Sequence, residues 1–140
     1  MTTRITISGP LLKGKPNAIV RQHMGRAIRE LVDLGIGRLA QTLRPRPAGV
    51  YLSASQAGPG RASTGNYRRH LSSTTKDLNA FITDGGVIYG PWLEGVGSRN
   101  KVTRFKGYAS FRRTAGWMRK QAPGVVKRHV GRLVRALGGQ

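Results

Sequence analysis

The sequence predicts an α+β fold, in which a small antiparallel sheet is packed by a long N-terminal helix and a kinked C-terminal helix. Near both ends of the chain, apolar residues recur at spacings of three and four, which is the period of one helical face. Between these segments lie short runs of β-branched and aromatic residues bounded by Gly, Pro and Asp, a pattern typical of hairpins. With 140 residues, the chain is predicted to form a single domain, residues 1–140, with a modest core.

The N-terminal part is predicted to form a strand and then a long helix. Residues Thr3–Ser8 alternate between apolar and polar side chains, as a half-buried strand does. A helix is expected from about Ala18 to Leu43, with Asn17 as its N-cap. Gly35 and Gly37 weaken this helix, each by about 1 kcal/mol relative to alanine. We therefore expect either a bend or the close approach of another backbone at these glycines.

The middle third is predicted to be a small antiparallel sheet or a hairpin-rich meander, because its apolar runs are short and turn-forming residues separate them. A long glycine-rich loop at Ser53–Gly65 is unusual inside a compact domain, and such loops are often functional. Strands are expected at Val50–Leu52, Gly65–Thr75, Ala80–Asp84 and Val87–Tyr89, with turns at Lys76–Asn79 and Asp84–Gly85.

The helical period returns after Gly107. One apolar stripe runs as far as Ala122, Pro123–Gly124 interrupts it, and a second stripe continues to Leu137. Because proline has no N–H to donate within a helix, we expect either one kinked helix or two consecutive helices.

The charge of the chain is strongly one-sided, with 25 Lys and Arg against five Asp and Glu and a formal net charge of +20. From Lys101 onward there is no acidic residue. Such a chain is expected to meet a polyanion or an acidic protein surface, because alone it repels itself. The alternative is a solvated basic face that only keeps the chain soluble. The candidate residues for facing DNA or an acidic partner are Arg112, Arg113, Arg119, Lys120, Lys127, Arg128, Arg132 and Arg135.

Several classes of function lack the residues that they need. The chain has no cysteine, which excludes disulfides, thiolate catalysis and cysteine-ligated metals and fits a reducing compartment. His23, His70 and His129 fall on different predicted elements, and the acidic residues form no evident acid–base pair. We therefore expect no enzyme activity, no metal and no cofactor. No apolar run reaches the roughly 20 residues of a membrane span, and the N-terminus lacks the apolar region of a signal peptide, so no membrane contact is expected.

The segment Val87–Ser98 combines features found nowhere else in the chain. It contains the only Pro-Trp pair, one of the few acidic residues, and glycines at positions 90, 95 and 97. Gly90–Pro91 is expected to end the preceding strand, and Trp92 and Leu93 offer an apolar contact beside Glu94. From the residues alone, this segment is either a packed turn around an ordinary core tryptophan or a surface for a partner.

The order of these features resembles the tail-completion, or neck, proteins of long-tailed bacteriophages. In that family a strand ends in tyrosine, a short apolar piece carries a glutamate, a Gly-Thr/Ser pair follows, and a Pro-Phe element leads into the last helix. The opening segment Ile5–Leu12 also resembles the family's first strand. Phe105 matches the aromatic residue, whereas Arg104 stands where the family usually has proline. The other matching residues are Tyr89, Glu94, Gly97 and Ser98.

The resemblance implies a structural virion protein. By analogy, a homo-oligomeric ring of six subunits would join the head connector to the tail, contacting the adjacent connector and tail proteins. The genomic DNA would pass unspecifically through the lumen. The protein would be made in the bacterial host cytoplasm and would reside at the head–tail junction of the virion.

A closed ring needs two different complementary patches on each subunit. We expect the Ser53–Gly65 loop to form one of them. In the other patch, Glu94 is expected to pair with an arginine of the neighbouring subunit. This other patch, which we call the first patch, is expected to contain Tyr89, Trp92, Leu93, Glu94, Arg104 and Phe105.

A free, non-enzymatic basic nucleic-acid-binding protein, ribosome-associated or nucleoid-like, is the alternative. It explains the charge equally well, but it explains the succession from Tyr89 to Phe105 less well. The two hypotheses differ in oligomeric state, because a free DNA-binding protein can be a soluble monomer with salt-sensitive binding.

Overall fold

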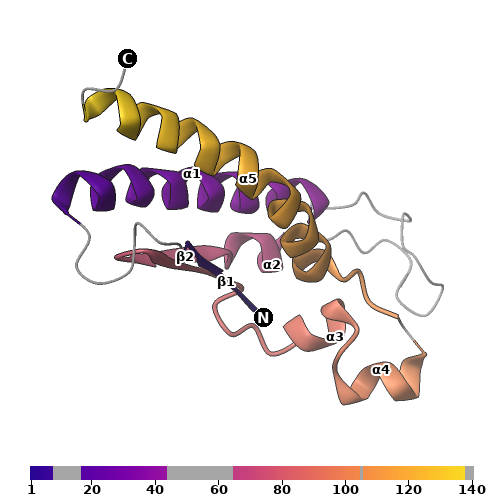
Figure 1. Cartoon of the computed structure of the whole chain (residues 1–140). Coiled ribbons are helices and arrows are strands. Elements are labelled where there is room, and N and C mark those ends of the chain that lie inside the picture. Colours follow the sequence, from indigo (N-terminus) through magenta and orange to yellow (C-terminus); the bar gives the residue numbers. More distant parts are fainter. Residues whose placement is uncertain (8–16, 44–64, 105, 138–140) are drawn as a thin grey trace.

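The computed structural model describes residues 1–7, 17–43, 65–104 and 106–137. A three-stranded antiparallel sheet lies beneath two long helices, and three short helices complete the fold (Figure 1). The predicted α+β class is therefore confirmed. In chain order the elements are β1 (Thr2–Thr6), α1 (Ala18–Thr42), α2 (Asn66–Arg69), β2 (Ser72–Lys76), β3 (Asn79–Thr83), α3 (Gly90–Glu94), α4 (Ser98–Thr103) and α5 (Ser110–Ala136).

The sheet has the strand order β1-β3-β2, so the last strand in the chain lies in the middle. Ile82 of β3 stands opposite Thr3 of β1 and Ser73 of β2. Side chains alternate between the two faces of a strand, and this register turns Ala80 and Ile82 toward the helices. β2 and β3 are joined by a turn at Asp77–Leu78, which confirms the turn predicted at Lys76–Asn79.

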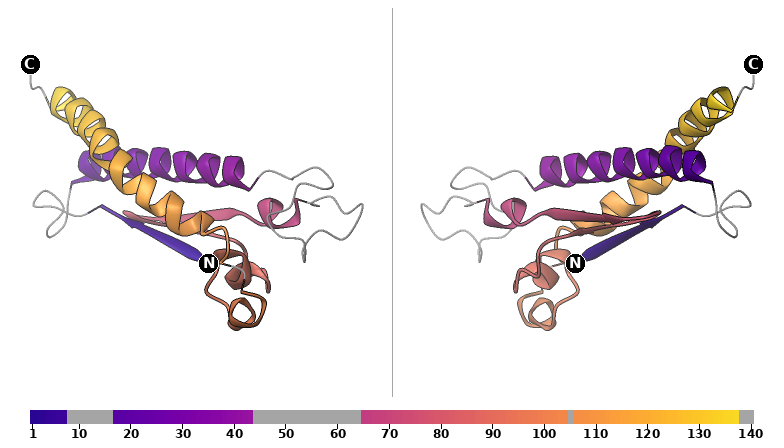
Figure 2. Two further views of the ribbon diagram at one scale, coloured as in Figure 1. Left: turned by 90° about the vertical axis from the view of Figure 1, so that its right-hand side faces the viewer. Right: turned by 90° about the vertical axis from the view of Figure 1, so that its left-hand side faces the viewer.

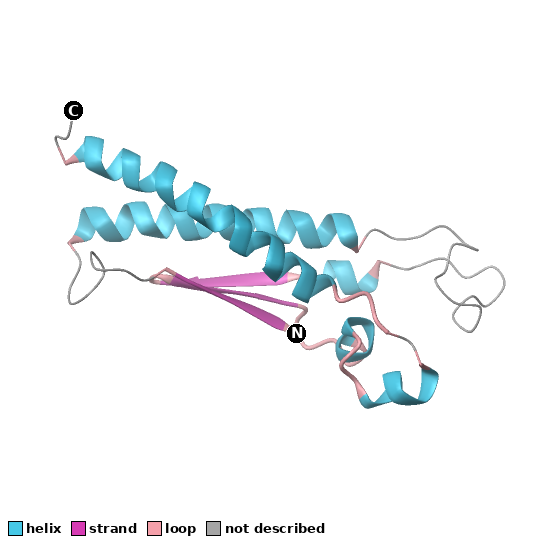
Figure 3. Cartoon of the chain, turned by 45° about the vertical axis from the view of Figure 1, so that its right-hand side comes forward, coloured by secondary structure: helices cyan, strands magenta, loops and turns pink. Residues whose placement is uncertain are grey.

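Helix α1 is the central element, because it packs against the sheet on one side and against α5 on the other (Figure 3). Its N-cap is Asn17, whose side-chain oxygen accepts hydrogen bonds from the N–H groups of Ile19 (2.8 Å) and Val20 (3.2 Å). Both the cap and the bounds of this helix were predicted within one residue. The buried residues of α1 are His23, Met24, Ala27, Ile28, Leu31, Val32, Gly35 and Leu39.

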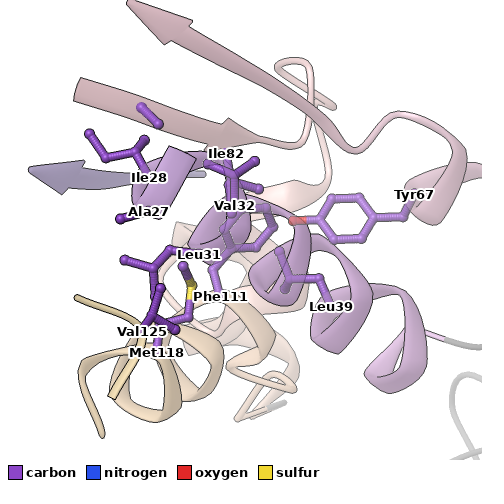
Figure 4. Packing of buried hydrophobic residues seen from close by; sticks show 11 residues of the cluster. Ala27, Ile28, Leu31, Val32, Leu39, Tyr67, Ile82, Phe111, Met118 and Val125 are labelled. Atoms are coloured by element: carbon purple, nitrogen blue, oxygen red, sulfur yellow. The ribbon is translucent and has the colours of Figure 1, made fainter. Parts of the chain in front are cut away.

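The core lies on both sides of α1. Figure 4 shows Leu31 beside Met118 and Val125 of α5, while Val32 lies close to Ile82 of the sheet. A Cβ atom at Gly35 would lie 2.6 Å from the sulfur of Met118 and 2.7 Å from Cδ1 of Ile82. Gly35 therefore permits close packing from both layers, although the approaching groups are side chains and not the predicted backbone.

Helix α5 is a single helix that runs through Pro123 and crosses α1 (Figure 2). The prediction of one kinked helix or two consecutive helices is thus resolved in favour of one. Phe111, Met118, Val125 and Leu133 are among its buried residues, and they continue one stripe across the proline. Pro123 removes one backbone hydrogen bond from the helix. The packing of this stripe against the core offsets that loss.

The prediction of one strand over Gly65–Thr75 is wrong in its first half. Residues 66–69 form α2, and its N-cap residue, Gly65, has a positive φ of 69°. Of the predicted strand, only the part from Ser72 onward is a strand, and it belongs to β2. Tyr67 is buried, and its contacts with distant residues determine the conformation here more than the local strand propensity does.

The predicted hairpin at Asp84–Gly85 and the returning strand at Val87–Tyr89 are also wrong. After β3 the chain makes turns, and Gly90–Pro91 begins α3 instead of ending a strand. Proline is tolerated in the first turn of a helix, because the N–H groups there have no partner within the helix in any case.

Some predictions fall on residues outside the described ones. These are Ser8 in the first strand, the strand at Val50–Leu52, nearly all of the Ser53–Gly65 loop, and Phe105.

Gly37→Ala is expected to raise the free energy of unfolding by about 1 kcal/mol, because alanine favours the helix and a Cβ atom there meets nothing within 4 Å. Gly35→Ala is the matched change, and we expect it to destabilise, since overpacking costs about 1–3 kcal/mol. Urea unfolding of both variants measures the difference. Equal stabilisation by the two substitutions would contradict the tight packing at Gly35.

Candidate interaction surfaces

Residues 87–104, which we call the lobe, contain α3 and α4 and lie at one end of the sheet below the start of α5 (Figures 2 and 3). The lobe includes the segment that resembles the phage motif. Helices this short are not stable alone. Their positions must therefore come from contacts with the rest of the chain.

Glu94 joins the lobe to α5. The residue is only 2% exposed, and its Oε1 accepts a hydrogen bond from the backbone N–H of Phe111 (3.0 Å) in the first turn of α5. The first N–H groups of a helix lack partners within it, and a negative charge is favourable at that end. A second link is the hydrogen bond from the N–H of Tyr108 to the carbonyl of Leu93 (2.6 Å).

Gly95 and Gly107 bring two backbone segments into direct contact beside this link. Their φ angles are +82° and +73°, in the left-handed region that favours glycine. A Cβ atom at Gly95 would clash with the carbonyl of Lys106, and one at Gly107 would clash with the backbone of Gly95. Gly97, in contrast, has an ordinary φ of −82° and acts as the N-cap residue of α4.

Asp84 fixes the segment that leads from β3 into the lobe. Its carboxylate is 1% exposed and accepts hydrogen bonds from the Tyr67 hydroxyl (3.0 Å) and the Gly86 N–H (3.1 Å). It also forms an ion pair with the amino group of Met1 (2.9 Å). Burial pushes the pKa of Asp84 upward, but the hydrogen bonds from the amino group, Gly86 and Tyr67 outweigh it and hold the pKa below its usual value. Gly90 leaves room for this carboxylate, because a Cβ atom there would clash with Oδ2.

Tyr67 fills the space between the lobe and the core. Its ring lies 6.0 Å from the ring of Tyr89 and 6.5 Å from that of Phe111. Burial first, and then the nearby Asp84 carboxylate, raise the pKa of the Tyr67 hydroxyl, so it stays protonated and donates to Asp84. The hydroxyl of Tyr89 accepts a hydrogen bond from the side chain of Asn66 (2.7 Å).

Three apolar residues of the lobe are exposed. Ile88 is 97% exposed, Val102 85% and Val96 59%. These three residues were not among those predicted to form a surface. The signal was present, since each is a β-branched apolar residue in a short segment that could not bury all of its apolar side chains.

The six residues of the predicted first patch have different environments. Tyr89 and Arg104 are exposed, Trp92 and Leu93 are half-buried, and Phe105 lies outside the described residues. Glu94 is buried within the subunit and bonded to Phe111, so its carboxylate is not presented to a neighbour.

Arg104 ends α4 with a φ of +54°. Proline cannot adopt this angle, because its ring holds φ near −65°. The departure from the phage motif at this position is therefore accompanied by a backbone conformation that excludes the family's usual residue.

The second candidate surface is the outer face of α5. All eight basic residues predicted to face DNA or an acidic partner are exposed. Only Arg128 among them forms an ion pair in the described part of the chain, with Glu30 of α1, which His129 also contacts (2.8 Å). Hydrogen bonds from His129 and then from Arg128 lower the pKa of Glu30 below its usual value.

Among the residues that the structure describes, no group of three His, Asp or Glu side chains could hold a metal ion, and no helix is long and apolar enough to cross a membrane. Comparison with protein-family models, curated proteins and solved structures finds no match to this chain. The described geometry offers two surfaces for binding, one apolar and one basic.

Gly95→Ala is expected to destabilise the protein by about 3 kcal/mol or more, because it combines a positive φ with a backbone clash at Lys106. Gly86→Ala is the control, since its φ of +74° is similar but its Cβ atom would meet nothing within 4 Å. We expect the control to lose only about 1 kcal/mol in thermal or urea unfolding. Similar losses in both variants would show that the contact between Gly95 and Lys106 contributes nothing.

Asp84→Asn is expected to lower the free energy of unfolding by about 1–3 kcal/mol near neutral pH, because three donors lose a charged acceptor. The folded-state pKa of Asp84 is depressed, so its stabilisation is present above the unfolded value of about 4 and is lost as the pH falls below it. The stability curves of the wild type and the variant should therefore converge in acid. Asp77→Asn, at an exposed carboxylate 3.9 Å from Arg21, is the control and should change little.

Proposed function

We propose that this protein is a structural subunit of a bacteriophage neck, which assembles as a homo-oligomeric ring and joins the head connector to the tail around the DNA path. The observation that carries the proposal is the exposed apolar surface of the lobe. It occurs on the segment whose residues resemble the tail-completion family, and exposed apolar patches are typical of interaction sites.

The construction of the lobe supports this proposal. Glu94, Gly95 and Gly107 hold it firmly against the start of α5, so Ile88, Val96 and Val102 are presented by a rigid support. A preorganised surface loses less conformational entropy when a partner binds. The lobe is thus suited to an assembly in which subunits bind one another through complementary surfaces.

The proposal assigns Glu94 a different role from the one predicted. The glutamate stabilises the lobe from inside the subunit, and the contact with the neighbouring subunit is made by the exposed side chains of Ile88, Val96 and Val102. Apolar and aromatic side chains at the centre of an interface commonly contribute most of its binding energy.

The exposed cations of α5 favour the second candidate, a free nucleic-acid-binding protein. That function accounts for the basic face but leaves the exposed apolar lobe without a role. The six-fold order, the connector and tail partners and the location in the virion remain parts of the proposal that rest on the resemblance.

The test is electron microscopy of phage particles that lack this protein. We expect separate DNA-filled heads and finished tails, and we expect joining to be restored by the wild-type protein. The variant Ile88→Ser/Val102→Ser should fold normally, because both side chains are exposed, but it should not restore joining.

A variant at other exposed positions, Thr74→Ser/Lys76→Gln, is the matched control and should restore joined particles. Intact, infectious particles in the absence of the protein would overturn the neck function. Full activity of the Ile88→Ser/Val102→Ser variant would remove the lobe from the interface.

A further inference from the structure

The outermost line of α5 is a row of cations separated by seven residues. Arg113, Lys120 and Lys127 repeat at this spacing, and all three are exposed. Seven residues are close to two helical turns, so the three side chains project from one side, about 10 Å apart. They lie opposite the stripe of Phe111 and Met118, which is buried against the core. We call Arg113, Lys120 and Lys127 the ridge.

Basic residues also flank the ridge on both sides. Arg112 and Arg119 precede ridge residues in the sequence, and Arg128, Arg132 and Arg135 extend the basic face toward the end of the helix. Helix α5 itself contains no acidic residue. By contrast, α1 carries Glu30 and Asp33 among its arginines. Of the two long helices, only α5 thus has basic residues and no acidic ones, and only its Arg128 is paired with an acidic residue in the described part of the chain.

Glycines lie between the cations of this face. A Cβ atom at Gly116 or Gly131 would meet nothing within 4 Å, and one at Gly124 would meet only the end of Arg128, at 3.9 Å. The fold therefore does not require glycine at these positions, although each glycine disfavours the helix by about 1 kcal/mol. Small residues between long cationic side chains allow a large, stiff partner to approach the helix backbone closely.

We propose that the ridge of α5 binds the phosphate backbone of duplex DNA, without reading its bases. The ridge extends over roughly 21 Å, a length of duplex that carries about a dozen phosphate charges. It has no exposed aromatic residue for stacking on single-stranded bases, since Trp117 is half-buried and lies beside Arg38. Phosphate contacts of this kind give affinity that depends on salt and not on sequence.

An acidic protein is the other partner that would match the charge. The centre of a protein interface is usually depleted of charged residues and enriched in aromatic ones. Arg113, Lys120, Lys127 and the intervening glycines have the opposite composition. Among the described residues, the three large apolar side chains with the highest exposed fractions, Ile88, Val102 and Val96, are on the lobe, at a different place in the fold. We therefore assign the protein partner to the lobe and the DNA to the ridge.

This inference goes beyond the neck function, because it concerns the full-length protein in solution and does not require a ring. Within a ring, binding of the ridge to DNA would orient the outer face of α5 toward the DNA path. The exchange of counterions at phosphates is reversible, so the attraction is compatible with DNA that moves.

The experiment measures binding of the full-length protein to a short duplex at several salt concentrations, with Arg113→Gln/Lys120→Gln/Lys127→Gln as the test variant. We expect affinity to fall by about one hundredfold near 0.1 M salt, and the slope of log K against log salt to decrease by roughly 3. Two duplexes of unrelated sequence should bind equally. Glutamine is a good helix former, so the fold should persist, and circular dichroism checks this.

The matched control is Arg68→Gln/Lys76→Gln/Lys101→Gln, which removes the same charge from exposed positions outside α5. We expect it to retain nearly wild-type affinity and slope. If both triple variants lose affinity equally, binding follows net charge alone and the ridge is not the site. If the ridge variant loses binding to polyglutamate but not to DNA, an acidic protein is the partner and the proposal is overturned.

A second variant, Gly116→Leu/Gly131→Leu, keeps the charge and tests the close approach. It should bind duplex DNA several-fold more weakly although its helix is more stable, and unchanged affinity would contradict approach along the glycines. These binding measurements remain valid if phage particles assemble without the protein, so failure of the neck function and failure of this inference are distinguishable.

Discussion

Three carboxylates connect the parts of this fold. Glu94 bonds the lobe to the first turn of α5, Asp84 bonds α2 and the start of β1 to the chain that leads into α3, and Glu30 bonds α1 to the second half of α5. Each joins segments that are distant in sequence. In a chain with only five acidic residues, most of the negative charge therefore stabilises the internal structure.

This use of the acidic residues shapes the surface. Asp33 and Asp77 are the exposed carboxylates among the described residues, whereas basic side chains are exposed on every long helix. Self-repulsion disfavours such a surface until a polyanion or another partner neutralises it. The basic face of α5 and the apolar lobe are separate in the fold, so one subunit can contact two different partners at once.

The long helices were predictable because their signals are local and repeated. The stripe of α1, its Asn17 cap and the apolar face of α5 follow from residue spacing, and so does the hairpin turn before β3. The segment at Val87–Tyr89 was mispredicted, since three β-prone residues indicate a strand only if a neighbouring strand pairs with them. Here Tyr89 instead packs beside Tyr67, and Ile88 remains exposed.

The sequence by itself determined the fold class, the two amphipathic helices, the lack of thiol chemistry and the concentration of cations in the last forty residues. These properties depend on composition and on spacings of a few residues. Only the tertiary structure decided that Glu94 is buried, that Gly95 meets Lys106 and Gly107, and that Ile88 and Val102 are exposed. Such contacts join residues without a fixed spacing in the chain, so no local pattern encodes them.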